Sequence, residues 1–395
     1  MNILRNPEYR GILILILVIA GMGFVLAVAT GRISLFSGPK ALDKIVFVSD
    51  VTGSREICAM NAEGSGRTQL TTGAAVRSAP AMSPSGDRIV YVGRFGNSDQ
   101  VFATGAEGGT PDRLTSATGP KKEPRYTPDG SQLSFIASGR VYVAETNGDS
   151  PHPIFPTAYE VRAAMSDPLR RGDVPAYYGY AWGPDSAAIV GVRKDSDGND
   201  SAVFLADTRS EPKFIPFAGL LNEVLRQEGA SQRRIAPGER VRVTGLGWAA
   251  KAPVFAVSVV SRNDGFLIVF GVQKGQLRFS GFRSFEGHEI GQPAFAPDGS
   301  ALAIPTSSAD GSSEAGLLKL DLASGRAQVI ASGVFQRPSY SPRGDRILAT
   351  LSDEIRQTRD LVVIELTTGR LKRLTRDGGS YDAIWSPASD TGDPH

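Results

Sequence analysis

Tyr340-Ser341-Pro342-Arg343-Gly344 is the stretch that decides the fold, because closely similar stretches recur along the chain. Each has a large apolar or aromatic residue, a small residue and a proline, and most continue to a glycine. The other copies are MSPSG (82–86), YTPDG (126–130), WGPD (182–185), FAPDG (295–299) and WSP (385–387). Proline presets φ for a turn and glycine supplies a positive φ, so each copy predicts a tight turn.

The spacing of these turns predicts a repeated unit. Successive prolines are separated by 44, 56, 113, 45 and 45 residues. The longest gap has room for one degenerate copy, and Trp248-Ala249-Ala250 stands where that copy is needed. Apolar runs such as Ile89–Val92 and Ile347–Ala349 follow the turns, and hairpin signals such as Asp197-Gly198-Asn199 follow those runs. Four short strands in each unit of about 45 residues are typical of a β-propeller blade.

A family resemblance rests on these turns together with a second motif, a Leu-Thr pair at the end of the third strand after the turn. This pair occurs at Leu70-Thr71, Leu114-Thr115 and Leu374-Thr375. The unit resembles the WD40-like repeat of TolB-type β-propellers over residues 41–388. The resemblance implies an all-β propeller, and the copies predict seven blades, with six or eight as alternatives. TolB-type proteins have six blades behind a separate α/β domain, so a TolB-specific role does not follow.

The two ends of the repeat region predict how the ring closes. The region begins with the second strand of a blade, near Lys44, and ends with a first strand over residues 381–386. We expect the last strand to pair with the first one, which removes two open sheet edges.

The N-terminus predicts a membrane segment before the propeller. Residues 11–31 contain no charged side chain, and about 20 apolar residues in a helix span a bilayer core. Arg5 and Arg10 precede the run, which favours a cytoplasmic N-terminus and an extracytoplasmic propeller. The alternative is a signal peptide that is cleaved near Ala29, which would leave a secreted or periplasmic protein. Either interpretation places the propeller outside the cytoplasm.

The predicted organisation therefore has five parts. They are a cytoplasmic tail (1–10), a transmembrane helix or signal sequence (11–31), a linker (32–43), the propeller (44–388) and a disordered tail (389–395).

Two repeats are longer than the others, and their extra residues predict a binding surface. The insertions fall within residues 156–176 and 217–243, where they are expected to lie side by side over the central funnel. Long loops on a rigid scaffold often carry binding residues, and Tyr and Arg often anchor interfaces. The candidate partner-binding residues are Tyr159, Arg162, Arg170, Arg171, Tyr177, Tyr178, Arg226, Arg233 and Arg234. The alternative is that the insertions only cap the funnel.

Few residues indicate chemistry. The three histidines, His152, His288 and His395, are scattered, and the sequence has no HExxH, GxSxG or phosphate-binding motif. One weak metal candidate is the calcium-loop-like cluster of Asp195, Asp197, Asn199 and Asp200, but Gly198 is misplaced for such a loop, and the residues are those that a hairpin turn favours. Cys58 is the only cysteine, so no intramolecular disulfide can form. No cofactor is predicted.

These observations predict a non-enzymatic binding or scaffold module at a bacterial cell envelope, with a protein partner and a membrane anchor. The net charge of +2 gives no indication of nucleic-acid binding. The alternative is a propeller enzyme, a lyase or hydrolase, that acts on an extracellular polysaccharide or peptide.

Overall fold

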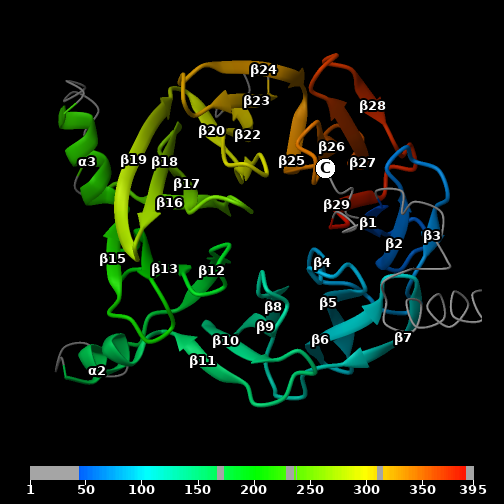
Figure 1. Ribbon diagram of the computed structural model, residues 1–395, viewed down its shortest axis with the longest axis horizontal. Helices are drawn as coiled ribbons and strands as arrows, with labels where there is room; N and C mark the ends of the chain where they lie inside the picture. Colours follow the sequence, from blue (N-terminus) through cyan, green and yellow to red (C-terminus); the bar gives the residue numbers. More distant parts are fainter. Residues whose placement is uncertain (1–43, 167–172, 228–234, 237, 309–314, 388–395) are drawn as a thin grey trace, which may run out of the picture. The chain divides into compact units, whose positions relative to one another are not determined.

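Seven antiparallel sheets stand like blades around a common centre in the computed structural model (Figure 1). The structure describes residues 44–166, 173–227, 235–236, 238–308 and 315–387. We number the blades 1 to 7 around the ring and give each from its innermost to its outermost strand. The seven-bladed prediction is confirmed, and closures with six or eight blades are excluded.

The first three blades contain the N-terminal third of the propeller and the last strand of the chain. Blade 1 consists of β29 (Ser380–Trp385), β1 (Lys44–Ser49), β2 (Glu56–Asn61) and β3 (Thr68–Gln69). Blade 2 consists of β4 (Ala81–Met82), β5 (Arg88–Phe95), β6 (Ser98–Gly105) and β7 (Gly108–Arg113). Blade 3 consists of β8 (Lys121–Tyr126), β9 (Gln132–Ala137), β10 (Arg140–Glu145) and β11 (His152–Phe155).

The other four blades follow in chain order, and the innermost strand of blade 6 is broken into β20 and β21. Blade 4 consists of β12 (Tyr177–Trp182), β13 (Ile189–Lys194), β14 (Asp200–Leu205) and β15 (Lys213–Pro216). Blade 5 consists of β16 (Val241–Trp248), β17 (Val254–Ser261), β18 (Asp264–Gln273) and β19 (Gln276–Phe285). Blade 6 consists of β20 (His288–Ile290), β21 (Ala294–Phe295), β22 (Ala301–Ser308), β23 (Gly316–Asp321) and β24 (Ala327–Ser332). Blade 7 consists of β25 (Val334–Tyr340), β26 (Arg346–Asp353), β27 (Thr358–Glu365) and β28 (Leu371–Arg373).

The proline turns join the first and second strands of the blades, as predicted. In blade 2 the Ser83 N–H donates to the Arg88 carbonyl at 2.8 Å, and the Arg88 N–H donates to Ser83 Oγ at 3.0 Å. The degenerate copy in blade 5 keeps the first of these bonds, because the Ala249 N–H donates to the Val254 carbonyl at 2.9 Å. The copy that lacks proline therefore still forms the turn, and the predicted seventh repeat is confirmed.

Blade 1 contains strands from both ends of the propeller. Strand β29 pairs antiparallel with β1, with Trp385 opposite Ile45 and Ser380 opposite Ser49. The Ser386 N–H donates to the Lys44 carbonyl at 2.8 Å, and the Lys44 N–H donates to Ser386 Oγ at 3.0 Å. This is the bonding pattern of the blade 2 turn, made by residues at opposite ends of the propeller. The predicted closure is confirmed.

The Leu-Thr pairs lock the outermost part of a blade to its third strand. Buried Thr71 donates through Oγ1 to Glu56 at 2.7 Å and accepts the Ile57 N–H at 2.9 Å. The same arrangement occurs in two other blades, where it joins Thr115 to Gln100 and Val101, and Thr375 to Asp360 and Leu361. The Leu before the Thr is buried in two of these copies, Leu70 and Leu114. The motif therefore fills the core and satisfies a strand-edge N–H at the same point.

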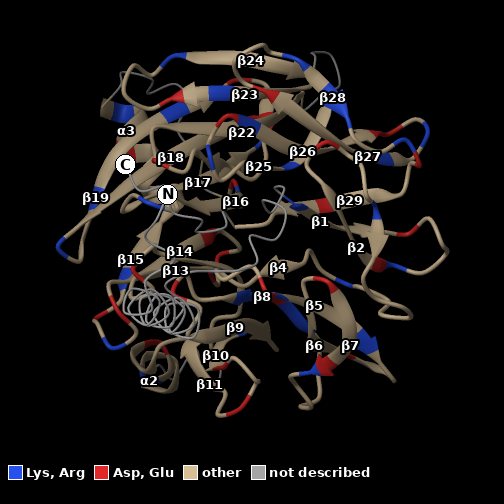
Figure 2. Ribbon diagram, turned by 45° about the vertical axis from the view of Figure 1, so that its right-hand side comes forward, with Lys and Arg blue, Asp and Glu red and all other residues tan. Residues whose placement is uncertain are grey.

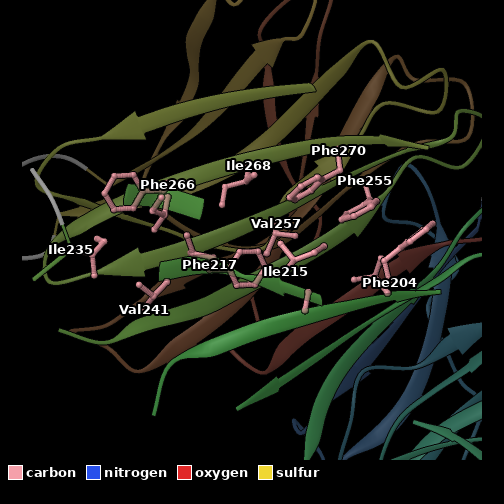
Figure 3. Close-up of a cluster of buried hydrophobic side chains, with 14 of the residues drawn as sticks. Phe204, Ile215, Phe217, Ile235, Val241, Phe255, Val257, Phe266, Ile268 and Phe270 are labelled. Carbon is pink, nitrogen blue, oxygen red and sulfur yellow. The ribbon is translucent and has the colours of Figure 1, made fainter. Parts of the chain in front are cut away.

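Both insertions contain a helix at the rim of the propeller, so the expectation that they lie over the central funnel is wrong (Figure 1). The helices are α2 (Ala158–Ser166) and α3 (Phe217–Gln227). Helix α3 buries Phe217, Leu221 and Leu225 in the core between blades 4 and 5. Figure 3 shows Phe217 within this cluster of aromatic and branched side chains. The apolar face of α3 therefore seals the junction between blades 4 and 5.

None of the helices in the described part of the chain is long and apolar enough to cross a membrane. The predicted membrane segment (11–31), linker (32–43) and C-terminal tail (389–395) lie outside the described residues. The membrane anchor and the alternative signal peptide therefore stay predictions.

Candidate functional site

The innermost strands enclose a central channel with charged walls. A cavity of about 610 Å³ is lined by strands and turns of several blades, and its charged side chains include Glu123, Arg125, Arg337 and Asp382. A second cavity of about 370 Å³ shares Arg125 with the first one. Elsewhere in the described residues, acidic and basic segments are interspersed (Figure 2). The channel is therefore the place where side chains from many blades meet.

Three of these charged residues occupy the same position in their repeats. Glu123, Arg337 and Asp382 each stand five residues before the turn proline of their repeat. Each lies at a register shift between the first and second strands of its blade. Each also has a left-handed backbone, with φ of 49°, 47° and 51° respectively. Non-glycine residues with positive φ are uncommon and are found most often at functional sites. The shared backbone conformation therefore makes these three positions candidates for a functional site.

Ion pairs connect these residues across the channel. Arg125 lies 2.8 Å from Glu123 on the same strand, β8. Arg337 on β25 lies 3.8 Å from Glu123 and 3.2 Å from Asp382 on β29. Strands β8 and β25 stand on opposite sides of the centre (Figure 1). The Arg337–Glu123 contact therefore spans the channel, and the four side chains form one network, here called the channel network.

Tyr180 of blade 4 supports the channel network from behind. Its hydroxyl donates to the Glu123 carbonyl at 2.6 Å, and the Arg125 guanidinium lies 5.9 Å from its ring centroid. Within the described residues, Arg125 Nε is buried and has no hydrogen-bond partner. A buried donor without a partner is unfavourable, and proteins tolerate such local costs mainly at functional sites.

The two carboxyl groups of the network differ in their acidity. Burial raises the pKa of Asp382, and the positive charge of Arg337 offsets only part of this effect. Burial also acts on Glu123, but the charges of Arg125 and Arg337 outweigh it and lower the pKa of that carboxyl. The pKa values of the two carboxyls beside Arg337 are thus shifted in opposite directions. Such a difference in pKa is common between the acid and the base of an active site.

Further arginines surround Asp382. The charges of Arg359 and Arg55 also act to lower its pKa. The Arg359 guanidinium lies 3.4 Å from the ring centroid of Tyr381, the residue before Asp382, and 3.0 Å from Asp50. The surroundings of Asp382 are therefore cationic, which suits a substrate that carries negative charge.

Five of the predicted partner-binding residues lie within the described part of the chain, on α2, β12 and α3. Tyr159 is exposed on α2, and Arg162 is exposed on the same helix. Tyr177 is buried and donates to Glu160 at 2.7 Å, so it is a core residue. Tyr178 on β12 is 41% exposed, and burial and Asp200 raise its pKa. Arg226 is exposed on α3, where it pairs with Glu223 at 2.6 Å.

Four other predicted binding residues lie outside the described residues, namely Arg170, Arg171, Arg233 and Arg234. Their predicted role stays a prediction.

The weak calcium-loop candidate forms the hairpin between β13 and β14. Asp197 Oδ1 accepts the Asn199 N–H at 2.9 Å, and Asp195 pairs with Arg193 at 3.0 Å. Asn199 and Asp200 accept the N–H groups of Val241 and Val243 in blade 5, at 2.8 and 2.7 Å. These contacts match the turn interpretation, since the side chains are engaged by the hairpin and the next blade.

Sequence reasoning missed the channel network, although the sequence contains a signal for it. Counting five residues back from each turn proline finds Glu123, Arg337 and Asp382, together with Gln292. Three charged residues at one register position would have indicated a charged ring in the channel.

The fold is shared with solved structures of very different sequence. An oligogalacturonate lyase in complex with manganese has 14% sequence identity and a TM-score of 0.55, and 84% of each chain is covered. A putative 6-phosphogluconolactonase from Bacteroides fragilis has 15% identity and a TM-score of 0.55, over 89% of this chain and 99% of that one. TolB from Acinetobacter baumannii has 11% identity and a TM-score of 0.45, over 84% of this chain and 79% of that one.

No family model and no curated protein sequence matches the chain. At such low identity the structural likeness establishes the fold alone, a seven-bladed propeller of the broad class to which the sequence repeat points.

The prediction that the chain is not an enzyme is corrected by these comparisons. It rested on scattered histidines and missing motifs, yet two of the similar structures bear the names of enzymes, a lyase and a putative lactonase. Motif searches also overlook residues that different blades bring together, such as Asp382 and Glu123.

A metal like the manganese in the lyase structure does not fit the described side chains. Among the described residues no group of three or more His, Cys, Asp or Glu side chains could hold a metal ion. His152 and His288 lie on β11 and β20, in different blades. We therefore derive no step through a metal.

Proposed function

We propose that this chain is a propeller enzyme of the lyase or hydrolase type that acts on an acidic polysaccharide in its central channel. The observation that carries the proposal is the position of Asp382. It combines a raised pKa, an arginine 3.2 Å away and a left-handed backbone, at the centre of a channel network built from several blades. A general acid or base works best when its pKa lies near the operating pH, and burial moves Asp382 in that direction.

Each member of the network has a role in this proposal. Arg337 and Arg125 bind a carboxylate of the substrate, because guanidinium groups recognise carboxylates through paired hydrogen bonds. Glu123, whose pKa is lowered, stays ionised and holds both arginines in place. Asp382 transfers the proton. In an elimination the ionised Asp382 removes the proton beside the bound carboxylate, the bond to the leaving sugar oxygen breaks as the double bond forms, and that oxygen takes a proton from water. In a hydrolysis the protonated Asp382 donates to the leaving oxygen as the glycosidic bond breaks, and the water that adds to the sugar returns its proton to Asp382.

The proposed site of action is outside the cytoplasm. This part of the proposal rests on the uncharged residues 11–31 and on Arg5 and Arg10 before them. Attachment of a reporter enzyme that is active only outside the cytoplasm tests it. A reporter joined after His395 should be active, and activity of a cytoplasmic reporter at the same position would contradict the proposal.

Turnover of acidic polysaccharides tests the enzymatic part. Purified protein is incubated with polygalacturonate, alginate and hyaluronan, and with neutral dextran for comparison. Reducing ends are counted for either reaction class, and ultraviolet absorbance detects the unsaturated ends that only an elimination forms. We expect cleavage of at least one acidic polymer and none of dextran.

Two variants connect turnover to the channel. Asp382→Asn should lower kcat by about 100-fold or more, as the loss of a general acid or base does. Glu354→Gln changes an exposed carboxyl in the hairpin between β26 and β27, which is not part of the channel network, and should leave turnover unchanged. Equal activity of wild type and Asp382→Asn on a cleaved polymer would remove Asp382 from the mechanism. Failure of all acidic polymers would reject the substrate class.

A further inference from the structure

A second hollow lies at the rim of the propeller, away from the innermost strands. A cavity of about 750 Å³ is bordered by α2, by residues 173–176, by the end of β13 and by β15. Its lining contains two aromatic rings and more acids than bases, namely Tyr159, Phe214, Glu160, Asp173, Asp195 and Asp197 against Arg193 and Lys194. We call this hollow the α2 cavity.

Buried ion pairs hold the inner wall of the α2 cavity rigid. Glu160 is buried and accepts from Arg193 at 2.6 Å, from the Tyr177 hydroxyl at 2.7 Å and from the Thr157 N–H at 2.8 Å. Arg193 also pairs with Asp195 at 3.0 Å. Arg193 is therefore neutralised by two carboxylates. The wall is preorganised, which lowers the entropic cost of binding a partner.

The rim of the α2 cavity exposes aromatic surface. Tyr159 is 51% exposed and Phe214 is 41% exposed, and their ring centroids lie 6.0 Å apart. The Arg193 guanidinium lies 5.2 Å from the Phe214 ring, so this wall already stacks one arginine on an aromatic face. Exposed aromatic rings that are backed by a fixed wall are typical anchors of protein interfaces.

The negative charge of the α2 cavity favours a partner with a cationic side chain. The lining carries four carboxylates and two cations, so the cavity attracts positive charge. Tyr159 also borders a cavity of about 810 Å³ whose charged lining residues are Arg162, Arg209 and Glu211, so the excess of carboxylates in the α2 cavity does not extend to this neighbour. A guanidinium can stack on a tyrosine ring and pair with a carboxylate at once, which an ammonium group does less well.

We propose that the α2 cavity binds an arginine side chain of a partner protein, stacked on Tyr159 and paired with Asp173. This inference is independent of the enzymatic proposal, since it uses no residue of the channel network. It uses one of the candidate residues from the sequence, Tyr159, together with carboxylates that the sequence did not single out.

Ligand-observed NMR with small probes tests the proposal on the full-length protein. The probes are acetyl-Gly-Arg-Gly-amide, the matched lysine peptide and the matched glutamate peptide. We expect saturation transfer to the arginine peptide, weaker transfer to the lysine peptide and none to the glutamate peptide. Tyr159→Ala should weaken binding of the arginine peptide by about tenfold. Asp173→Asn should weaken it several-fold, and the loss should shrink at high salt.

Each variant must fold for the binding comparison to be valid. Asp173 is exposed, so Asp173→Asn is expected to fold, and thermal unfolding checks this for each variant. Arg226→Ala on α3 is the matched control and should bind the arginine peptide like wild type. Equal binding by wild type and Tyr159→Ala, or preferred binding of the glutamate peptide, would overturn the proposal. Absence of any transfer to the arginine peptide would overturn it as well.

Discussion

At the scale of single residues, Asp382 combines two features that disfavour folding. Its backbone has a φ of 51°, which costs about 1 kcal/mol or more for a side chain other than glycine. Its carboxyl is also held where burial disfavours the charged form. Proteins tolerate such local costs mainly where function requires them, so stability and function should separate at this position.

The first prediction is that Asp382→Asn stabilises the protein at neutral pH. Because the pKa of Asp382 is higher in the folded state, folding favours the protonated carboxyl, and stability is lost as the pH rises through the folded pKa. Asparagine does not titrate, and it tolerates positive φ better than most residues. Urea unfolding across a pH series should show a more stable variant near pH 7 and convergence only below the unfolded pKa of aspartate, about 3.9. A less stable variant at neutral pH would mean that the attraction to Arg337 outweighs burial.

At the scale of elements, the Leu-Thr pair predicts that Thr71 contributes much more to stability than its neighbour Thr72. Thr71→Val removes a buried hydroxyl that donates to Glu56 and accepts the Ile57 N–H. It should cost about 1–3 kcal/mol of unfolding free energy, because Glu56 and the Ile57 N–H are then left unpaired. Thr72 is exposed, so Thr72→Val should change stability by less than about 0.5 kcal/mol. Urea unfolding of both variants measures the difference in unfolding free energy. Equal losses of unfolding free energy would mean that Thr71 does not lock the outermost part of the blade to its third strand.

Helix α3 carries a prediction of its own. Leu221 is buried in the core between blades 4 and 5, so Leu221→Ala should destabilise the protein by about 2–5 kcal/mol. Arg226 lies on the exposed side of the same helix, and Arg226→Ala should have little effect. Thermal and urea unfolding compare the two variants. A small loss for Leu221→Ala would mean that the core closes without the helix.

The sequence predicted the elements that are made by local residues. The turn at Ser83 needs only its own neighbours in the chain, so its chemistry is visible in the repeat. The surface that α3 covers depends on strands of blade 5 that follow later in the chain, so local residues could not predict it. The channel network was missed for the same reason. Glu123 and Arg337 meet only because the ring brings blades 3 and 7 to opposite sides of one channel.

At the scale of the whole molecule, the ring depends on one strand pairing. Each of blades 2 to 7 is continuous in the chain, whereas blade 1 joins β29 to β1 across nearly the whole sequence. The contact also belongs to the core, since Trp385 and Ile45 lie in one buried cluster with Leu348 of blade 7. Asp382 lies on the same strand, so closure of the ring and assembly of the proposed active site are one event.

The last prediction follows from this coupling. A chain that ends at Asp377 lacks β29 and should lose the cooperative unfolding of the whole propeller, because β1 and blade 7 then expose open, apolar edges. A chain that ends at Pro387 retains β29 and Ser386, and it should unfold in urea with the same midpoint and steepness as the full chain. Hydrogen exchange should show that the backbone amides of blades 1 and 7 lose their protection first in the shorter chain. If the shorter chain kept one steep unfolding transition, the pairing of β29 with β1 would be dispensable for the stability of the propeller. The proposed coupling between ring closure and assembly of the active site would then be wrong.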